Sequence, residues 1–238
     1  MPPAPSLPED TLTPPTGGED REVSETLILI GPGGNLGRAA ARRFGSAGFH
    51  VALVGRDPEK LQAQALELRA AAVSVEVEVA EATDLASVDR AVRAILERRG
   101  APDVLLYNAA VVKGGALVDM PLEAIAHDLL VNAGAAMAAA RAVLPPMVAR
   151  GRGTVLFTSG GLIHAPQPAY TSLSVGKFAL NALAQCLAKD PALGDIHVAQ
   201  LVVHAHISET VGEHLAGLYL ELHRESKGSW RTEVLYPV

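Results

Sequence analysis

The chain has 238 residues and a formal net charge of −6; hydrophobic residues make up 49% of it and aromatic residues only 4%. An acidic chain without a run of Lys and Arg is a poor candidate for binding nucleic acid or an anionic membrane surface. The single cysteine, Cys186, excludes an internal disulfide and a cysteine-built metal site, and we expect it to be a small buried side chain on a helix. This length and an Ala-, Val- and Leu-rich composition fit one α/β domain.

The first 24 residues differ in composition from the rest. Residues 1–24 are rich in Pro, Gly, Thr and acidic residues, which predicts a disordered N-terminal tail before a folded domain over 25–238. No apolar stretch approaches 18 residues, and the N-terminus lacks the basic and apolar regions of a signal peptide. We therefore expect no membrane span and a cytoplasmic location.

From residue 26 onward, short apolar runs alternate with helical patterns. The expected strands are 26–30, 50–54, 73–79, 104–107, 154–158, 197–203 and 230–236. The expected helices are 36–47, 58–71, 85–99, 121–149 in one or two pieces, 171–190 and 210–225. Because parallel strands need right-handed crossovers, the alternation predicts a Rossmann-type, doubly wound parallel sheet with helices on both faces, in a single domain.

A glycine-rich loop follows the first expected strand and opens the first helix. Its residues include Gly31, Gly33, Asn35, Leu36 and Gly37. Residues without side chains let a pyrophosphate approach the backbone, and the helix N-terminus supplies N–H groups and a positive dipole end. The loop therefore predicts binding of a dinucleotide; the alternative is a purely structural turn.

This loop resembles the Thr-Gly-x-x-x-Gly-x-Gly loop of the short-chain dehydrogenase/reductase (SDR) family. Gly31 and Gly37 match the first and last glycines, and Asn35 replaces the middle one. Asn tolerates a left-handed backbone better than most residues, so we expect the turn to be kept. The resemblance spans about residues 26–238 and implies a homodimer or homotetramer.

Two further segments resemble cofactor contacts of the family. Glu81 and Ala82 resemble its adenine-contacting Asp-Val pair. Asn108 and Ala109 resemble its Asn-Ala-Gly stretch, with Tyr107 where a first Asn is often found.

The end of the second strand indicates which nucleotide is bound. NAD-binding Rossmann folds usually place an acid there to bind the ribose 2′-hydroxyl, whereas a nearby arginine favours a 2′-phosphate. Gly55 fills the acid position and Arg56 follows it. We expect NADP(H) rather than NAD(H); the alternative is that Arg56 is a solvated charge and Asp57 caps the next helix.

The resemblance also assigns catalytic residues. SDR enzymes generally use Asn, Ser, Tyr and Lys: Tyr transfers the proton, Lys lowers the Tyr pKa and holds the nicotinamide ribose, Ser orients the substrate, and Asn shapes a proton relay. Asn132, Ser159 and Lys177 lie at the matching positions. The common tyrosine position, four residues before the lysine, is Leu173, which cannot transfer a proton.

Tyr170 is the candidate acid instead, seven residues before Lys177. On an α-helix, seven residues return to nearly the same face, one turn further than four. This spacing resembles the divergent SDR branch that includes the enoyl-acyl-carrier-protein reductases, although Gly160 stands where that branch usually has an aromatic residue. The alternative is that Tyr170 only packs at the helix start.

Beyond the sixth strand, Ile207 fits the position that contacts the nicotinamide amide in the family. His204 and His206 are unusual there, and they belong either to a polar loop or, through His206, to acid–base chemistry. Nothing fixes a metal site from these two and His164, so we expect none. The apolar face of helix 210–225 suggests a substrate lid or subunit packing.

These residues predict an NADP(H)-dependent oxidoreductase that transfers hydride to a carbonyl or an activated double bond of a small-molecule substrate. Leu173 keeps a second hypothesis open, a catalytically impaired SDR-fold sensor or scaffold that binds NADP(H). A third is a redox-neutral lyase or isomerase that reuses the pocket through His206 or Ser159.

Overall fold

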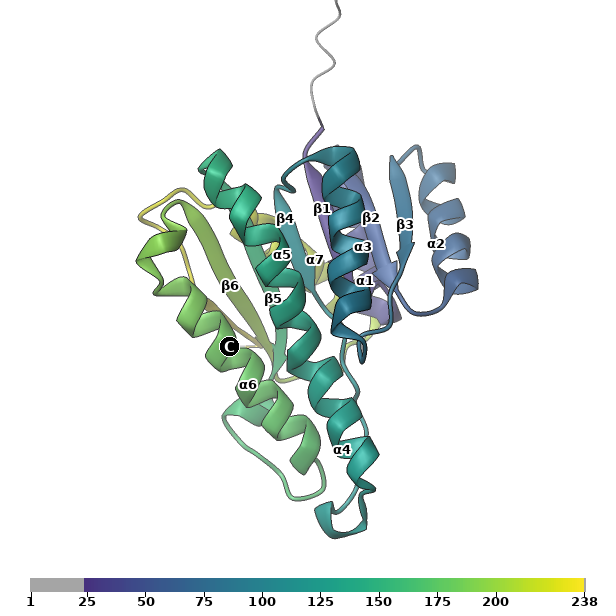
Figure 1. The fold of residues 1–238 in the computed structure, drawn as a ribbon, viewed down its shortest axis with the longest axis vertical. Helices are drawn as coiled ribbons and strands as arrows, with labels where there is room; N and C mark the ends of the chain where they lie inside the picture. The colour runs from purple at the N-terminus through teal and green to yellow at the C-terminus, as the bar shows by residue number, and fades with distance from the viewer. Residues whose placement is uncertain (1–23, 238) are drawn as a thin grey trace, which may run out of the picture.

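In the computed structural model, residues 24–237 are described, and residues 1–23 of the expected tail lie outside this range. The strands of the described part are β1 (Thr26–Ile30), β2 (His50–Gly55), β3 (Val75–Val79), β4 (Val104–Tyr107), β5 (Gly153–Gly160), β6 (Ile196–Val203) and β7 (Glu233–Tyr236). They form one sheet in the order β3-β2-β1-β4-β5-β6-β7, and all neighbours are parallel (Figure 1). The predicted doubly wound sheet is confirmed.

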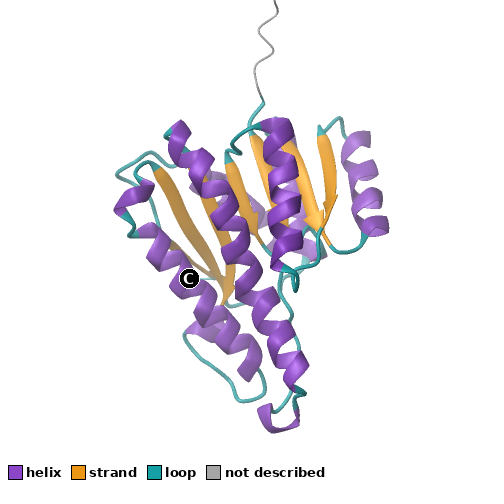
Figure 2. Cartoon of the chain, viewed as in Figure 1, coloured by secondary structure: helices purple, strands orange, loops and turns teal. Residues whose placement is uncertain are grey.

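Helices connect successive strands, as right-handed crossovers require (Figure 2). They are α1 (Gly34–Ser46), α2 (Pro58–Ala70), α3 (Leu85–Arg99), α4 (Leu122–Leu129), α5 (Ala135–Arg150), α6 (Thr171–Ala188) and α7 (Glu209–Arg224). The π-helical turn Leu130–Gly134 joins α4 to α5, so the expected helix 121–149 is two pieces in one continuous rod. Such π-turns are frequent at functional sites, and this one carries Asn132.

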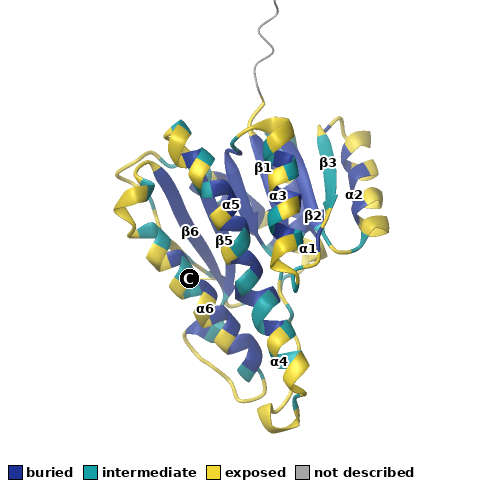
Figure 3. Ribbon diagram, in the orientation of Figure 1, coloured by how far each residue is buried: buried dark blue, intermediate teal, exposed yellow. Residues whose placement is uncertain are grey.

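The core lies in two layers, one on each face of the sheet. Helices α1 and α7 cover one face, and α3, α5 and α6 cover the other (Figures 1 and 3). Side chains alternate along each strand, so on β5 Leu156 packs toward α1 and α7 while Phe157 packs toward α3, α5 and α6. The same alternation directs Thr158 to the α7 side and Ser159 to the α6 side.

Two expectations about helices need correction. The apolar face of α7 is fully buried against α1 and the sheet through Leu215, Tyr219 and Leu222, so it is core and not a lid. Cys186 is exposed, because it lies on the outer face of α6. The rod Leu122–Arg150 is long and apolar enough to cross a membrane, but 56% of its most apolar window is buried within the fold, as in a core helix.

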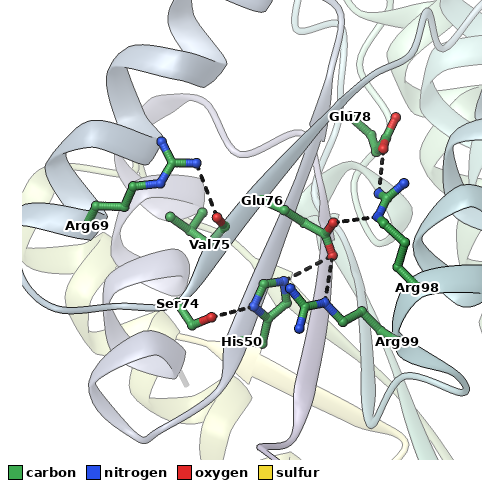
Figure 4. A network of polar contacts seen from close by, with 8 residues as sticks. All are labelled: His50, Arg69, Ser74, Val75, Glu76, Glu78, Arg98 and Arg99. Carbon is green, nitrogen blue, oxygen red and sulfur yellow. Dashed lines mark hydrogen bonds and ion pairs between the residues drawn. The ribbon is translucent and has the colours of Figure 1, made fainter.

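A dense polar network closes the amino-terminal end of strands β2 and β3 (Figure 4). The Glu76 carboxylate accepts hydrogen bonds from Arg98 Nε at 2.8 Å and Arg99 Nε at 3.3 Å, and lies 3.0 Å from His50 Nε2. Burial alone would raise the Glu76 pKa, but the bonds from Arg98 and His50 outweigh it and hold that pKa below its usual value. Burial, followed by the charge of Arg99, lowers the pKa of His50, so the ring is neutral, donates from Nε2 and accepts the Ser74 hydroxyl at Nδ1.

Candidate active site

The strand order reverses direction between β1 and β4, and in such sheets ligands bind beyond the carboxyl ends of the strands at this point. Gly31 follows β1 with φ +80°, and an added Cβ would lie 2.5 Å from the backbone nitrogen of Ala109, which follows β4. Only glycine fits there. By contrast, apart from its two chain neighbours, no described residue has an atom within 4 Å of a Cβ added at Gly33, the N-cap of α1, so this backbone is open to a ligand.

Asn35 differs from the expectation of a left-handed turn. It lies in the first turn of α1, and the left-handed backbone is carried by Gly31 and Gly34 instead. The Asn35 side chain has another role, because Nδ2 donates to the Ile207 carbonyl at 2.8 Å. This bond joins the glycine loop to the segment after β6, two regions that the sequence assigned to the same cofactor.

Asn108 links the same loop to the centre of the sheet. Its Nδ2 donates to the Gly31 carbonyl at 2.8 Å, and its Oδ1 accepts the Thr158 hydroxyl at 2.9 Å. Thr158 Oγ1 lies 2.7 Å from the Tyr219 hydroxyl, and burial raises the Tyr219 pKa well above its usual value. A chain of side chains therefore runs from α7 through β5 and β4 to the glycine loop.

The ends of β2 and β3 hold the residues expected near the adenosine. Asp57 caps α2 by accepting from the Lys60 backbone N–H at 3.1 Å, as one of the alternatives anticipated. The neighbouring Arg56 is exposed. Glu81 is also exposed, with Oε1 accepting from Thr83 N–H at 3.4 Å, while Ala82 packs against the core.

Lys177 and Ser159 lie at the carboxyl end of β5. Lys177 is 6% exposed, and its Nζ donates to the Thr158 carbonyl at 2.8 Å, one residue before Ser159. Burial lowers the pKa of Lys177 from 10.5 to about 8. The Ser159 hydroxyl is buried with no hydrogen-bond partner in the described structure. The Lys177 ammonium could donate to a ribose hydroxyl, and the unpaired Ser159 hydroxyl could bind a substrate oxygen.

Asn132 is fully buried in the π-turn, facing α6. Its Oδ1 accepts from Val111 N–H at 2.9 Å, which ties the segment after β4 to the helix. A Cβ added at Gly176, the residue before Lys177, would lie 2.6 Å from the Asn132 Cβ. The two helices therefore approach closely beside the lysine. Tyr107, one strand away, is buried and donates its hydroxyl to the Val131 carbonyl, so it is structural.

Tyr170 immediately precedes α6 as its N-cap residue, with φ −132° and ψ 36°. It is half-buried, and a Cβ added at Gly114 would lie 3.4 Å from its Cε1, so the ring borders the segment after β4. The backbone of the two segments is joined by Gly115 N–H donating to Ala169 O at 2.8 Å. Leu173 is buried at 5% exposure.

Of the three histidines His164, His204 and His206, the first two contact each other and the third does not. His164 Nδ1 and His204 Nε2 are 3.2 Å apart, with ring planes within 10° of each other. His206 is exposed and takes no part in this contact.

Several site residues were not identified from the sequence. The sequence did not indicate that Thr158 and Tyr219 support the site. Their hydroxyls meet only because β5 and α7, which are far apart in the sequence, pack together in the fold. The sequence did give a signal for Asp128: it is a charged residue in an apolar helical run, one turn before Asn132. It is buried and accepts the Ser172 hydroxyl at 2.8 Å.

Comparison with known proteins agrees with this architecture. The model of the short chain dehydrogenase family matches residues 25–211. The chain belongs to the short-chain dehydrogenase/reductase family. Dehydrogenase/reductase SDR family member 4 from Bos taurus is 30% identical over 164 residues, 68% of this chain and 59% of the relative. The Homo sapiens protein of that name is 30% identical over 180 residues, 75% of this chain and 65% of the relative. The match thus spans about three fifths of these relatives.

Solved SDR structures share the fold. A metagenomic short-chain oxidoreductase in complex with NADP superposes with a TM-score of 0.84 at 27% identity, covering 90% of this chain and 96% of that one. A short-chain dehydrogenase from Rhodopseudomonas palustris gives 0.82 at 23% identity, covering 90% and 98%, and supports the fold alone.

Proposed function

We propose that this SDR protein is an NADP(H)-dependent oxidoreductase that transfers hydride to a carbonyl or an activated double bond of a small molecule. The observation that carries the proposal is the grouping at the carboxyl end of β5: a buried Lys177 bonded beside a buried, unpartnered Ser159, next to Asn132. A buried ammonium beside a buried hydroxyl that has no partner offers hydrogen-bonding groups that a ligand can use.

The residues fit a nicotinamide dinucleotide. The open backbone at Gly33 and the N-terminus of α1 suit a pyrophosphate, and Gly37, Leu36 and Asn35 complete that turn. Arg56 suits a 2′-phosphate, which favours NADP(H), and the metagenomic relative was crystallised with NADP. We propose that the remaining contacts to the dinucleotide come from Glu81, Ala82, Asn108, Ala109, Lys177 and Ile207.

When bound, the nicotinamide supplies or accepts the hydride. The Tyr170 hydroxyl gives a proton to the substrate oxygen, or to the carbon–carbon double bond through an enolate, and recovers it from solvent. The Lys177 ammonium binds the ribose and favours ionisation of a nearby phenol. Ser159 orients the substrate oxygen, and Asn132 holds the segment after β4 against the helix.

A second candidate is a protein that binds NADP(H) without a redox step. Leu173 favours it, because a buried leucine stands where the common SDR tyrosine would be. The two proposals differ in whether Tyr170 takes over that role.

We also propose that the protein acts as a homo-oligomer in the cytoplasm, with no nucleic-acid or membrane partner. Val175 and Phe178 on α6 are 51% and 44% exposed, and Met137 on α5 is 56% exposed. Apolar side chains of this size on two adjacent helices suit subunit packing. Leu180 of α6, in contrast, is fully buried in the core and is not available for this role.

Mixing the protein with NADPH and a panel of carbonyl and enoyl thioester substrates tests the proposal. The expected result is NADPH consumption with at least one member and weaker binding of NADH than NADPH in calorimetry. NADPH binding without turnover across the panel would support the second candidate, and absence of nucleotide binding would exclude both.

A further inference from the structure

The start of α6 determines where the Tyr170 phenol lies. A tyrosine at position 173 would be held by the regular backbone of the helix, but Tyr170 precedes the helix with non-helical dihedral angles. Its N–H donates to Gln167 O at 2.9 Å, as in a turn, and its carbonyl accepts Ser174 N–H at 2.8 Å, which is the first hydrogen bond of the helix. The position of the ring therefore depends on how firmly the first turn of α6 is fixed.

A buried polar contact fixes that turn. Ser172, the second residue of α6, donates its hydroxyl to Asp128 Oδ2 on α4 at 2.8 Å. Asp128 is 4% exposed and Ser172 is 5% exposed. The other carboxylate oxygen lies 3.3 Å from Nδ1 of the adjacent His127. A buried carboxylate is costly without donors, so the arrangement of α4 and α6 that keeps this bond is strongly preferred.

A second contact, one helical turn further along, fixes how the two helices are aligned lengthwise. Asn132 follows Asp128 by four residues, and Gly176 follows Ser172 by four. Asn132 packs so closely on Gly176 that a Cβ there would lie 2.6 Å from the Asn132 Cβ. Asp128 lies at the end of α4 and Asn132 lies in the π-helical turn that continues it, so the two contacts form successive rungs between this continuous rod and α6. A slide of one helix along the other would break both.

We propose that Asp128, acting through the Ser172 hydroxyl, is a positioning residue for Tyr170. The inference rests on the proposed function, in which Tyr170 is the proton donor. A tyrosine outside the helix lacks the fixed geometry of position 173, and the Asp128–Ser172 bond supplies the missing constraint two residues away. Lys177, which lies inside the helix and donates to Thr158, is held without it.

Ser172→Ala tests the proposal, with Ser174→Ala as the matched control. Ser174 is also buried on α6, but its hydroxyl has no hydrogen-bond partner among the described residues. We expect Ser172→Ala to lower kcat about tenfold with KM and NADPH affinity within about twofold of wild type, a loss that corresponds to one ordinary hydrogen bond. Asp128→Asn keeps an acceptor oxygen for Ser172 and should retain most of kcat, whereas Asp128→Leu should not.

Combination with Tyr170→Phe separates positioning from folding. If Ser172 acts through Tyr170, adding Ser172→Ala to Tyr170→Phe lowers kcat no further, because the group being positioned is already absent. An additional tenfold loss in the double variant would contradict the proposal, since it would show an effect that does not pass through the phenol.

A readout that needs no substrate distinguishes this inference from the proposed function. The chain has four tyrosines, so spectra of protein labelled at tyrosine Cζ can be assigned. We expect Ser172→Ala to shift or broaden the Tyr170 resonance and leave Tyr107 and Tyr219 unchanged, and Ser174→Ala to leave all of them unchanged. A Tyr170 resonance identical in both variants would overturn the positioning role, even if Ser172→Ala lowers Tm. Failure to find any reduced substrate would instead count against the proposed function.

Discussion

Two groups of buried polar side chains at opposite ends of the sheet differ in how fully they are paired. At the amino-terminal end, Glu76 receives donors from two guanidinium groups and one imidazole, and His50 uses both ring nitrogens. At the carboxyl end, the Ser159 hydroxyl is buried without a partner among residues 24–237, and the Lys177 ammonium donates to the Thr158 carbonyl. A network whose donors and acceptors match contributes to the fold. The combination of Lys177 and Ser159, a buried charge and a buried hydroxyl with unused hydrogen-bonding capacity side by side, is suited to a ligand.

Of the substitutions that test this comparison, Tyr170→Phe should have the largest effect on kcat. Removing a proton donor at the carboxyl end should lower kcat by about 10²–10⁴-fold while NADPH affinity stays close to wild type. Steady-state kinetics with the best substrate of the panel, together with calorimetry, measures both. Tyr236→Phe on β7 is the control and should leave kcat unchanged; equal losses in the two variants would remove Tyr170 from the chemistry.

Arg56→Ala should have the next largest effect, on nucleotide choice. Loss of a guanidinium–phosphate contact weakens NADPH binding by about 10–100-fold and leaves NADH binding nearly unchanged. Lys60→Ala removes a positive charge four residues away and serves as the control. Similar weakening of both nucleotides by Arg56→Ala would indicate a general charge effect and contradict a 2′-phosphate contact.

The lowered pKa of Lys177 predicts a pH dependence. In the free enzyme the ammonium loses its proton above about pH 8, so kcat/KM should fall up to tenfold per pH unit beyond that point. Lys177→Arg stays charged, and its profile should lack this fall even though its rates are lower. An alkaline fall near pH 8 that persists in Lys177→Arg would assign it to another group.

A loss of folding stability does not explain the expected fall in kcat/KM at alkaline pH. The unfolded chain keeps the lysine proton up to about pH 10.5, whereas the folded chain loses it near 8. Between these values the unfolded state binds more protons, so the contribution of Lys177 to the free energy of unfolding increases with pH. Thermal unfolding measured across this range checks the sign.

Glu76→Gln should have the smallest effect on activity. It removes the carboxylate that Arg98 and His50 share, which should lower the free energy of unfolding by about 1–3 kcal/mol and leave kcat unchanged. Urea unfolding and steady-state kinetics on the same preparation measure the two. A loss of kcat larger than the loss of folded protein would show that the Glu76 network contributes to activity as well as to stability.

The amino-terminal end of the sheet also has a pH dependence, and like that of Lys177 it originates in a pKa lowered by burial. Burial lowers the pKa of His50 below 6.5, so below that pH the unfolded chain takes up a proton that the folded chain does not. Stability from this residue is therefore present above pH 6.5 and lost as pH falls toward the folded pKa. A thermal midpoint that rises on acidification through this range would contradict it.

The fold could be predicted because hydrophobic periodicity is local and strong. Runs such as 26–30 and 104–107 match their strands, and α3 has the expected bounds 85–99, with Asp84 and Gly100 as its caps. Contacts that depend on long-range geometry could not be predicted. The expected helix 171–190 began after Tyr170, as the structure has it, but the sequence could not show where the ring lies; Asn35 was assigned a backbone role although its side chain bonds to Ile207, 172 residues away.

The central claim is that Tyr170 takes over the proton transfer that Leu173 cannot perform. A crystal structure of the protein with NADP⁺ tests it most directly. The account predicts that the Tyr170 hydroxyl and Lys177 Nζ both lie within about 2.6–3.2 Å of the nicotinamide ribose hydroxyls, beside Ser159. A Tyr170 hydroxyl turned toward the segment at Gly114, out of reach of the ribose, with Leu173 lining the space beside Ser159, would contradict it.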